Sequence, residues 1–109
     1  MPLLASRVAL ITGASRGIGR ALALRFAKEG AAVVCLARSG DQVVETVALI
    51  TAAGGKAVAV VGDAGVVDDV SKAVFLGVSQ FGKLDTLVNN AGDGGPTKPV
   101  QEYSLEDWR

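Results

Sequence analysis

The chain has 109 residues, enough for one domain, and half of them are hydrophobic while a fifth are charged, which excludes a disordered chain. Eleven basic residues balance eleven acidic ones, which argues against a nucleic-acid partner. The chain has no His, which excludes His triads and His-ligated metal sites, and its single Cys, Cys35, excludes a Cys-cluster metal site and an internal disulfide. The longest apolar run, seven residues at 31–37, is far below the about 20 of a membrane span, and Arg7 interrupts the stretch that could act as a secretory signal, so a cytoplasmic protein with no membrane partner is expected.

Four short runs rich in Val, Ile, Leu and Ala predict β-strands. They cover residues 7–12, 32–37, 56–62 and 84–89, and they begin 25, 24 and 28 residues apart. Each run is almost continuously apolar instead of alternating with polar residues. Continuous apolar strands are typical of a parallel sheet that is covered on both faces.

Helical patterns fill the intervals between these runs, and each has a charged face that includes residues such as Arg20 and Glu45. The apolar stripes are Ile18, Leu22 and Phe26 with Ala21 beside them, then Val43, Val47 and Ile50, then Val70, Ala73, Val74, Val78 and Phe81. Glycines at 30, 54–55 and 82 are expected to end the helices in the left-handed conformation. The predicted fold class is therefore α/β: a Rossmann-like, doubly wound parallel sheet in the strand order 3-2-1-4.

A glycine-rich turn, TGASRGIG at residues 12–19, joins the first predicted strand to the first helix. Its glycines allow unusual backbone torsions and a close approach of the backbone to a ligand, and the helix that follows offers free amides to an anion. We interpret the turn as a diphosphate site; the alternative is a tight turn that binds nothing. The candidate cofactor-binding residues of this turn are Gly13, Ser15, Arg16, Gly17, Ile18 and Gly19.

With this turn and a second motif, NNAG at residues 89–92, the chain resembles the short-chain dehydrogenases/reductases, whose glycine motif is TGxxxGxG. The resemblance implies that Gly13, Gly17 and Gly19 shape the pyrophosphate site and that Ile18 lies beside the cofactor. It further implies that Asp63 accepts a hydrogen bond from the adenine amino group, that Asn89 ties its strand to the neighbours, and that Asn90, Ala91 and Gly92 line the ribose region. The alternative role for Asp63 is a solvated loop carboxylate or a helix cap.

The end of the second strand bears on the choice of cofactor. A carboxylate about 20 residues after the glycine turn would select NAD, but Ala37 takes that position and Arg38 follows it. The next acid, Asp41, is expected at the helix cap. A guanidinium suits a 2′-phosphate, and Arg16 and Ser39 can add to the same site, so NADP(H) is favoured over NAD(H). The alternative is that both arginines are ordinary solvated residues.

The family's catalytic Ser, Tyr, Lys and helical Asn have no counterparts here. Tyr103 lies only eleven residues beyond Gly92, and Asp107 stands where a YxxxK pattern needs Lys, so no catalytic residue is assigned. A last helix is expected to start at Ser104 and to run past Arg109. Residues 1–109 are therefore interpreted as the incomplete, N-terminal part of an NAD(P)-binding Rossmann domain, truncated after the fourth strand. The chain alone is expected to be inactive and marginally stable or self-associating.

By resemblance, the predicted function is hydride transfer between a nicotinamide and a carbonyl or secondary alcohol, in a protein whose homo-oligomeric state is left open. Two alternatives remain: a non-catalytic nucleotide-binding module, and an interaction fragment that borrows a strand from a partner.

Overall fold

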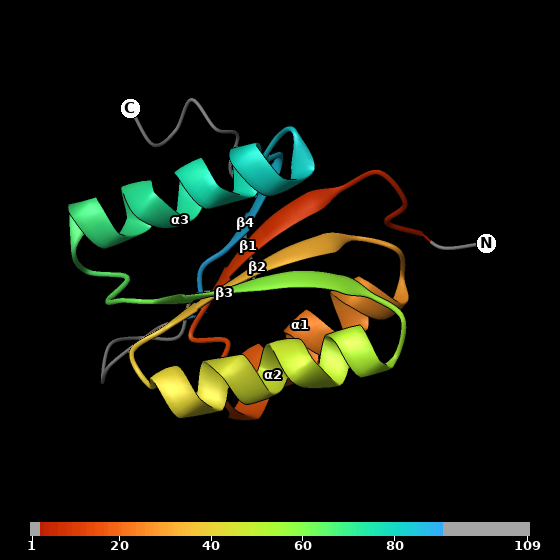
Figure 1. The fold of residues 1–109 in the computed structure, drawn as a ribbon, viewed down its shortest axis with the longest axis horizontal. Coiled ribbons are helices and arrows are strands. Elements are labelled where there is room, and N and C mark those ends of the chain that lie inside the picture. Colours follow the sequence, from red (N-terminus) through yellow and green to blue (C-terminus); the bar gives the residue numbers. More distant parts are fainter. Residues whose placement is uncertain (1–2, 91–109) are drawn as a thin grey trace.

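The computed structural model, which describes residues 3–90, contains one four-stranded parallel sheet and three helices (Figure 1). The strands are β1 (Val8–Thr12), β2 (Ala32–Ala37), β3 (Lys56–Val61) and β4 (Thr86–Val88), and the helices are α1 (Gly17–Lys28), α2 (Gly40–Ala52) and α3 (Val67–Phe81). The strand order is β3-β2-β1-β4, and every pairing is parallel. The predicted α/β architecture and its strand order are confirmed.

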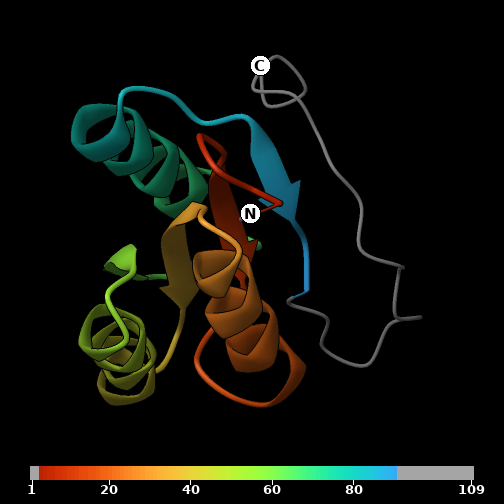
Figure 2. The same cartoon turned by 90° about the vertical axis from the view of Figure 1, so that its right-hand side faces the viewer.

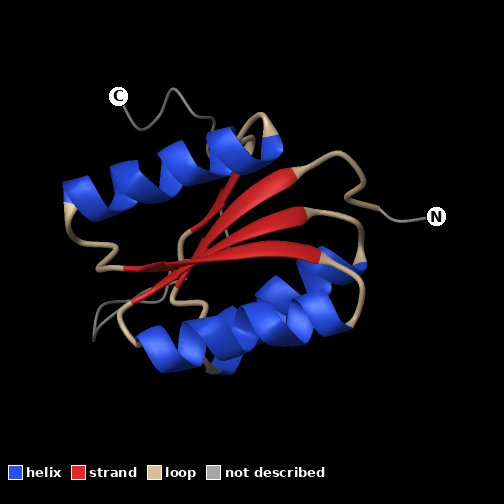
Figure 3. Cartoon of the chain, viewed as in Figure 1, coloured by secondary structure: helices blue, strands red, loops and turns tan. Residues whose placement is uncertain are grey.

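Helices cover the sheet on both faces: α1 and α2 lie on one side and α3 on the other (Figures 1 and 3). Side chains of a strand point alternately to the two faces. In β1, Ala9 and Ile11 accordingly join the core under α1 and α2, while Val8 and Leu10 join the core under α3. The continuous apolar runs of the sequence are therefore explained by two separate cores, one on each face.

The buried stripes of the helices differ from the predicted ones. In α1 the fully buried residues are Gly19 and Ala23, whereas Ile18 is 68% exposed and Ala21 is exposed. Small residues on the inner face let the helix lie close to the sheet, so the larger side chains are displaced to its flanks. Related shifts occur in the other helices, where Thr46 of α2 and Gly77 of α3 are buried while Val78 is exposed.

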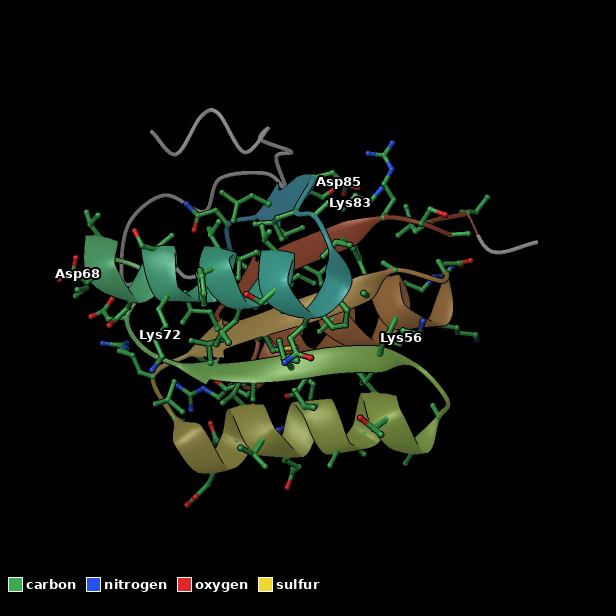
Figure 4. All side chains as sticks on the ribbon, turned by 45° about the horizontal axis from the view of Figure 1, so that its top comes forward. Lys56, Asp68, Lys72, Lys83 and Asp85 are labelled. Carbon is green, nitrogen blue, oxygen red and sulfur yellow. The ribbon has the colours of Figure 1, made fainter. Side chains whose placement is uncertain are left out.

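β4 is shorter than the predicted 84–89 (Figure 2). At each of its ends a side chain adds a hydrogen bond that joins it to β1, and at the first end this bond lies beside a backbone bond from Asp85 N to the Val8 carbonyl oxygen. Before the strand, Asp85 Oδ1 accepts a hydrogen bond from Val8 N at 3.1 Å. After it, Thr12 Oγ1 accepts from Asn90 N at 2.9 Å. Burial would raise the pKa of Asp85, but hydrogen bonds from Lys83, Thr86 and Val8 outweigh burial and leave that pKa below its usual value (Figure 4).

A left-handed glycine follows the end of each helix as predicted, except that Gly55, which was expected to share this conformation with Gly54, has no positive φ. Gly30, Gly54 and Gly82 have φ of 102°, 90° and 86°, so each takes the left-handed conformation after its helix. No helix within residues 3–90 is long and apolar enough to cross a membrane. The expected helix from Ser104 and the comparison of Tyr103 with Asp107 lie outside the described residues.

Candidate functional site

A cleft of about 800 Å³ opens at the edge of the sheet where the parallel strands have their carboxyl ends. Segments that follow all four strands line it. They contribute Gly13, Ser15, Arg16, Gly17, Ile18, Leu36, Ala37, Arg38, Ser39, Gln42, Gly62, Asp63, Ala64, Gly65, Asn89 and Asn90. Ligands of open α/β sheets bind at this edge, beside the point where the strand order reverses, here between β1 and β4.

The glycine-rich turn has the backbone that its sequence predicts. Gly13 and Gly17 have φ of 64° and 57°, a region that other residues resist. Gly19 is needed for a different reason: a Cβ added there would lie 1.8 Å from the Gly13 carbonyl oxygen. Gly19 does not line the cleft but lets the first turn of α1 pack directly against the turn that precedes it.

The amino end of α1 faces this cleft without any acidic side chain. Its N-cap, Arg16, is extended and makes no side-chain capping hydrogen bond, and the first turn holds no Asp or Glu. The first amides of a helix have no partner within the helix and carry a partial positive charge. The helix therefore presents its amides and this partial charge to the region lined by Arg16, Gly17 and Ile18.

The segment after β2 forms the neighbouring wall. Ala37, the last residue of the strand, lines the cleft, as do Arg38 and Ser39. The expectation that Asp41 caps α2 is wrong: Ser39 is the N-cap, and its Oγ accepts a hydrogen bond from Gln42 N at 3.4 Å, while Asp41 lies in the first turn. Ser and Asp are both good N-cap residues, and here the helix begins at Gly40, so the residue before it, Ser39, is the cap and Asp41 follows two positions later.

Asp63 lies in the loop between β3 and α3 and also lines the cleft. Its Oδ1 accepts a hydrogen bond from Gly65 N at 2.8 Å, so the carboxylate stabilises its own loop. At the next strand, Thr12 Oγ1 lies 3.1 Å from Asn89 Oδ1, which connects β1 to the segment after β4, as expected for Asn89. The backbone amide of Asn90 donates a hydrogen bond to the same Thr12 hydroxyl, so Asn90 is joined to β1 as well.

The structure thus brings most of the predicted site residues to one cleft. Gly13, Ser15, Arg16, Gly17, Ile18, Arg38, Ser39, Asp63 and Asn90 line it, Gly19 packs behind it, and Ala91 and Gly92 lie outside the described residues. The sequence analysis did not select Leu36, Gln42, Gly62, Ala64 or Gly65, although all five line the cleft. Their position at the end of a strand, in the loop after it, or in the first turn of the following helix is the signal that could have found them.

Cys35 is a core residue and not a reactive thiol of this cleft. Cys35 is fully buried in β2, and burial raises the pKa of its thiol to about 12, which agrees with its interpretation as a core residue. Within residues 3–90, no three or more His, Cys, Asp or Glu side chains are placed to hold a metal ion.

Comparison with known proteins places these features in a family. The model of the short chain dehydrogenase family matches residues 7–109. The chain is 45% identical to a 3beta-hydroxysteroid dehydrogenase of Mediterraneibacter gnavus, over 94% of this chain and 37% of that protein. It is 42% identical to a 3-oxoacyl-[acyl-carrier-protein] reductase of Synechocystis sp., over 100% of this chain and 44% of that protein. The crystal structure of a short chain dehydrogenase from Mycobacterium paratuberculosis bound to NAD superposes with a TM-score of 0.79 at 42% identity, covering 85% of this chain and 39% of that one.

Proposed function

The chain belongs to the short-chain dehydrogenase family, and from this premise we propose that it is the cofactor-binding, N-terminal part of an NADP(H)-dependent oxidoreductase. It spans 37% and 44% of the length of the two curated relatives compared above. The proposed reaction of the whole protein is hydride transfer between the nicotinamide and a carbonyl or secondary alcohol. A location in the cytoplasm and a small-molecule substrate belong to the same proposal.

The observation that carries this proposal is the meeting of the glycine turn and the uncapped amino end of α1 in one cleft. Gly13 and Gly17 have positive φ, and the first turn of α1 has no carboxylate to compete with a ligand for the free amides of the helix. These residues fit a diphosphate, which they would bind and orient. When bound, the cofactor supplies the hydride, while the protein positions it and excludes competing reactions.

The preference for NADP(H) is supported by the wall that follows β2. Ala37 lines the cleft at the position where an acid would bind the ribose hydroxyls, and Asp41 is not among the lining residues. Arg38 and Arg16, both of which carry a guanidinium, line the cleft. The Mycobacterium paratuberculosis structure holds NAD, so the shared fold by itself does not decide between the two cofactors.

The test is the ratio of the affinities for NADPH and NADH, measured by fluorescence titration. Arg38→Ala removes a charged hydrogen-bond donor from the 2′-phosphate site, so the preference for NADPH should fall by about tenfold. The matched control is Arg25→Ala, because Arg25 is also an exposed arginine but pairs with Glu29 at the far end of α1. An unchanged ratio in Arg38→Ala would contradict the choice of NADP(H). Failure of the wild-type protein to bind either cofactor would overturn the proposed function.

The isolated chain should associate and show no turnover. Within residues 3–90, β4 is an outer strand that pairs only with β1, although all three of its residues are buried. An unpaired edge of this kind is a template for contact with another chain. Sedimentation velocity over a range of concentrations should therefore show growing species, and NADPH should bind without being consumed. A monodisperse, cooperatively melting monomer would contradict this expectation.

Binding without turnover is also what a non-catalytic nucleotide-binding module predicts. Adding the rest of the family fold to this chain distinguishes the two hypotheses, because only the oxidoreductase should then turn over a substrate.

A further inference from the structure

A buried hydroxyl on α2 holds the glycine-rich turn from behind. Thr46 is fully buried, and its Oγ1 donates a hydrogen bond to the Ala14 carbonyl oxygen at 2.8 Å. A helical Thr usually bonds the carbonyl four residues earlier, but here that contact, to Gln42, is longer at 3.2 Å. Ala14 N also donates to the Leu36 carbonyl oxygen at 3.3 Å, so both polar backbone groups of Ala14 are bound.

Arg20 completes the connection from the side of α1. Its Nε donates to Thr46 Oγ1 at 2.9 Å, Nη2 donates to the Gln42 carbonyl oxygen at 2.9 Å, and Nη1 pairs with Glu45. All three partners belong to α2. The sequence pattern placed Arg20 on the solvated face, but its side chain is only 23% exposed and spans the two helices. Because Glu45 is 62% exposed, the ion pair contributes little, and the directed hydrogen bonds of the planar guanidinium matter more.

These contacts link the two walls of the cleft. Ala14 lies in the turn beside Gly13 and Ser15, which form one wall. Gln42 lies in the other wall, and its amide binds the Ser39 cap while its carbonyl accepts from Arg20. One hydroxyl and one guanidinium therefore join the turn and α1 to α2, in addition to the backbone bond from Ala14 N to the Leu36 carbonyl oxygen of β2.

We propose that Thr46 and Arg20 are positioning residues that hold the diphosphate-binding turn at a defined distance from the Arg38–Ser39 segment. This inference rests on the proposed function. If the Thr46 hydroxyl is removed, the Ala14 carbonyl is left without its buried partner and the turn shifts to regain one. A ligand that contacts both walls then loses affinity, whereas a ligand that contacts mainly the wall after β2 loses little.

The experiment compares two probes, NADP⁺ and adenosine 2′-monophosphate, which keeps the 2′-phosphate but has no phosphate at the 5′ position that the diphosphate occupies. In Thr46→Val, which keeps the shape but not the hydroxyl, NADP⁺ should bind about tenfold more weakly while binding of the monophosphate changes less than about threefold. Thr46→Ser should restore NADP⁺ binding. The control is Thr51→Val on the same helix, because the Thr51 hydroxyl bonds only its own helix, at Val47 O, and is exposed.

A second pair of variants guards against a folding defect. Arg20→Lys keeps the charge but not the planar guanidinium that bonds three groups of α2, so it should weaken NADP⁺ binding by about fivefold. Arg25→Lys, in the surface pair with Glu29, should leave NADP⁺ binding unchanged. Equal losses for the two probes in Thr46→Val, or wild-type affinity in both Thr46→Val and Arg20→Lys, would overturn the positioning role. If the wild-type protein binds neither probe, the proposed function and this inference fail together, and that result is distinct from the other two.

Discussion

The first turns of α1 and α3 both follow the carboxyl end of a parallel strand, but they differ in the acidic residues that they hold. The first turn of α1 holds no acidic residue. The first turn of α3 holds Asp68 and Asp69, and Asp69 Oδ2 accepts a hydrogen bond from Asp63 N at 2.8 Å. Figure 4 shows Asp68 at this end of α3, opposite the end near Lys83 and Asp85.

The difference separates a helix end that the protein stabilises itself from one that it leaves for a ligand. Carboxylates near an amino terminus interact favourably with the helix dipole, so α3 gains stability from its own residues. α1 forgoes this gain and instead has glycines with positive φ next to its first turn. An anionic ligand that binds the amino end of α1 would stabilise the helix in place of an internal carboxylate.

The largest expected effect comes from Gly19→Ala. The added Cβ would lie 1.8 Å from the Gly13 carbonyl oxygen and 2.7 Å from Asn90 Nδ2, so the turn must separate from the helix. Because the contact is with backbone, we expect the free energy of unfolding to fall by more than about 3 kcal/mol. Urea denaturation followed by circular dichroism measures this change.

Gly40→Ala is the matched control at the same edge of the sheet. Its added Cβ would lie 3.4 Å from Val61 Cγ2, an ordinary contact, in the first turn of α2. Alanine favours helix over glycine, so stability should stay within about 1 kcal/mol or increase. If Gly19→Ala unfolds at the same urea concentration as the wild type, the close approach of α1 to the turn is not required.

A smaller effect is expected from Ile18→Asp, which gives α1 the kind of acid that α3 already has. Ile18 is 68% exposed at the mouth of the cleft, so the substitution disturbs little packing. The new carboxylate should stabilise the helix by about 0.3–1 kcal/mol while weakening NADPH binding by about tenfold through charge repulsion. Thermal unfolding and fluorescence titration measure the two effects, and the loss of affinity should shrink at high salt.

Two controls separate charge from shape in this comparison. Ile18→Asn introduces a polar side chain without the charge and should retain most of the affinity. Asp68→Asn removes an acid from α3 and should lower stability slightly without changing NADPH binding, because Asp68 does not line the cleft. Equal affinity of Ile18→Asp and Ile18→Asn would show that the amino end of α1 does not bind the cofactor's charge.

Prediction of local structure was most accurate where the conformation of a few neighbouring residues decides it. Gly13 and Gly17 have the positive φ that the glycine spacing predicts, and Arg38 follows the strand end that the apolar run predicts. It was least accurate where a side chain acts on a distant element. The predicted polar face of α1 gave no indication that Arg20 binds α2, and the cap of α2 was assigned to Asp41 instead of Ser39.

The sequence by itself determined the succession of strands and helices, the burial of β1, β2 and β4 on both faces and the place of the glycine turn, whereas the edge strand β3 is largely half-buried or exposed. All of these follow from periodicity and backbone preference within a few neighbouring residues. Only the tertiary structure decided which residues limit β4, why Gly19 cannot carry a side chain, and how Thr46 reaches Ala14. Those contacts join residues far apart in the chain. Their distances depend on how closely the helices and strands pack, and local sequence patterns do not specify that.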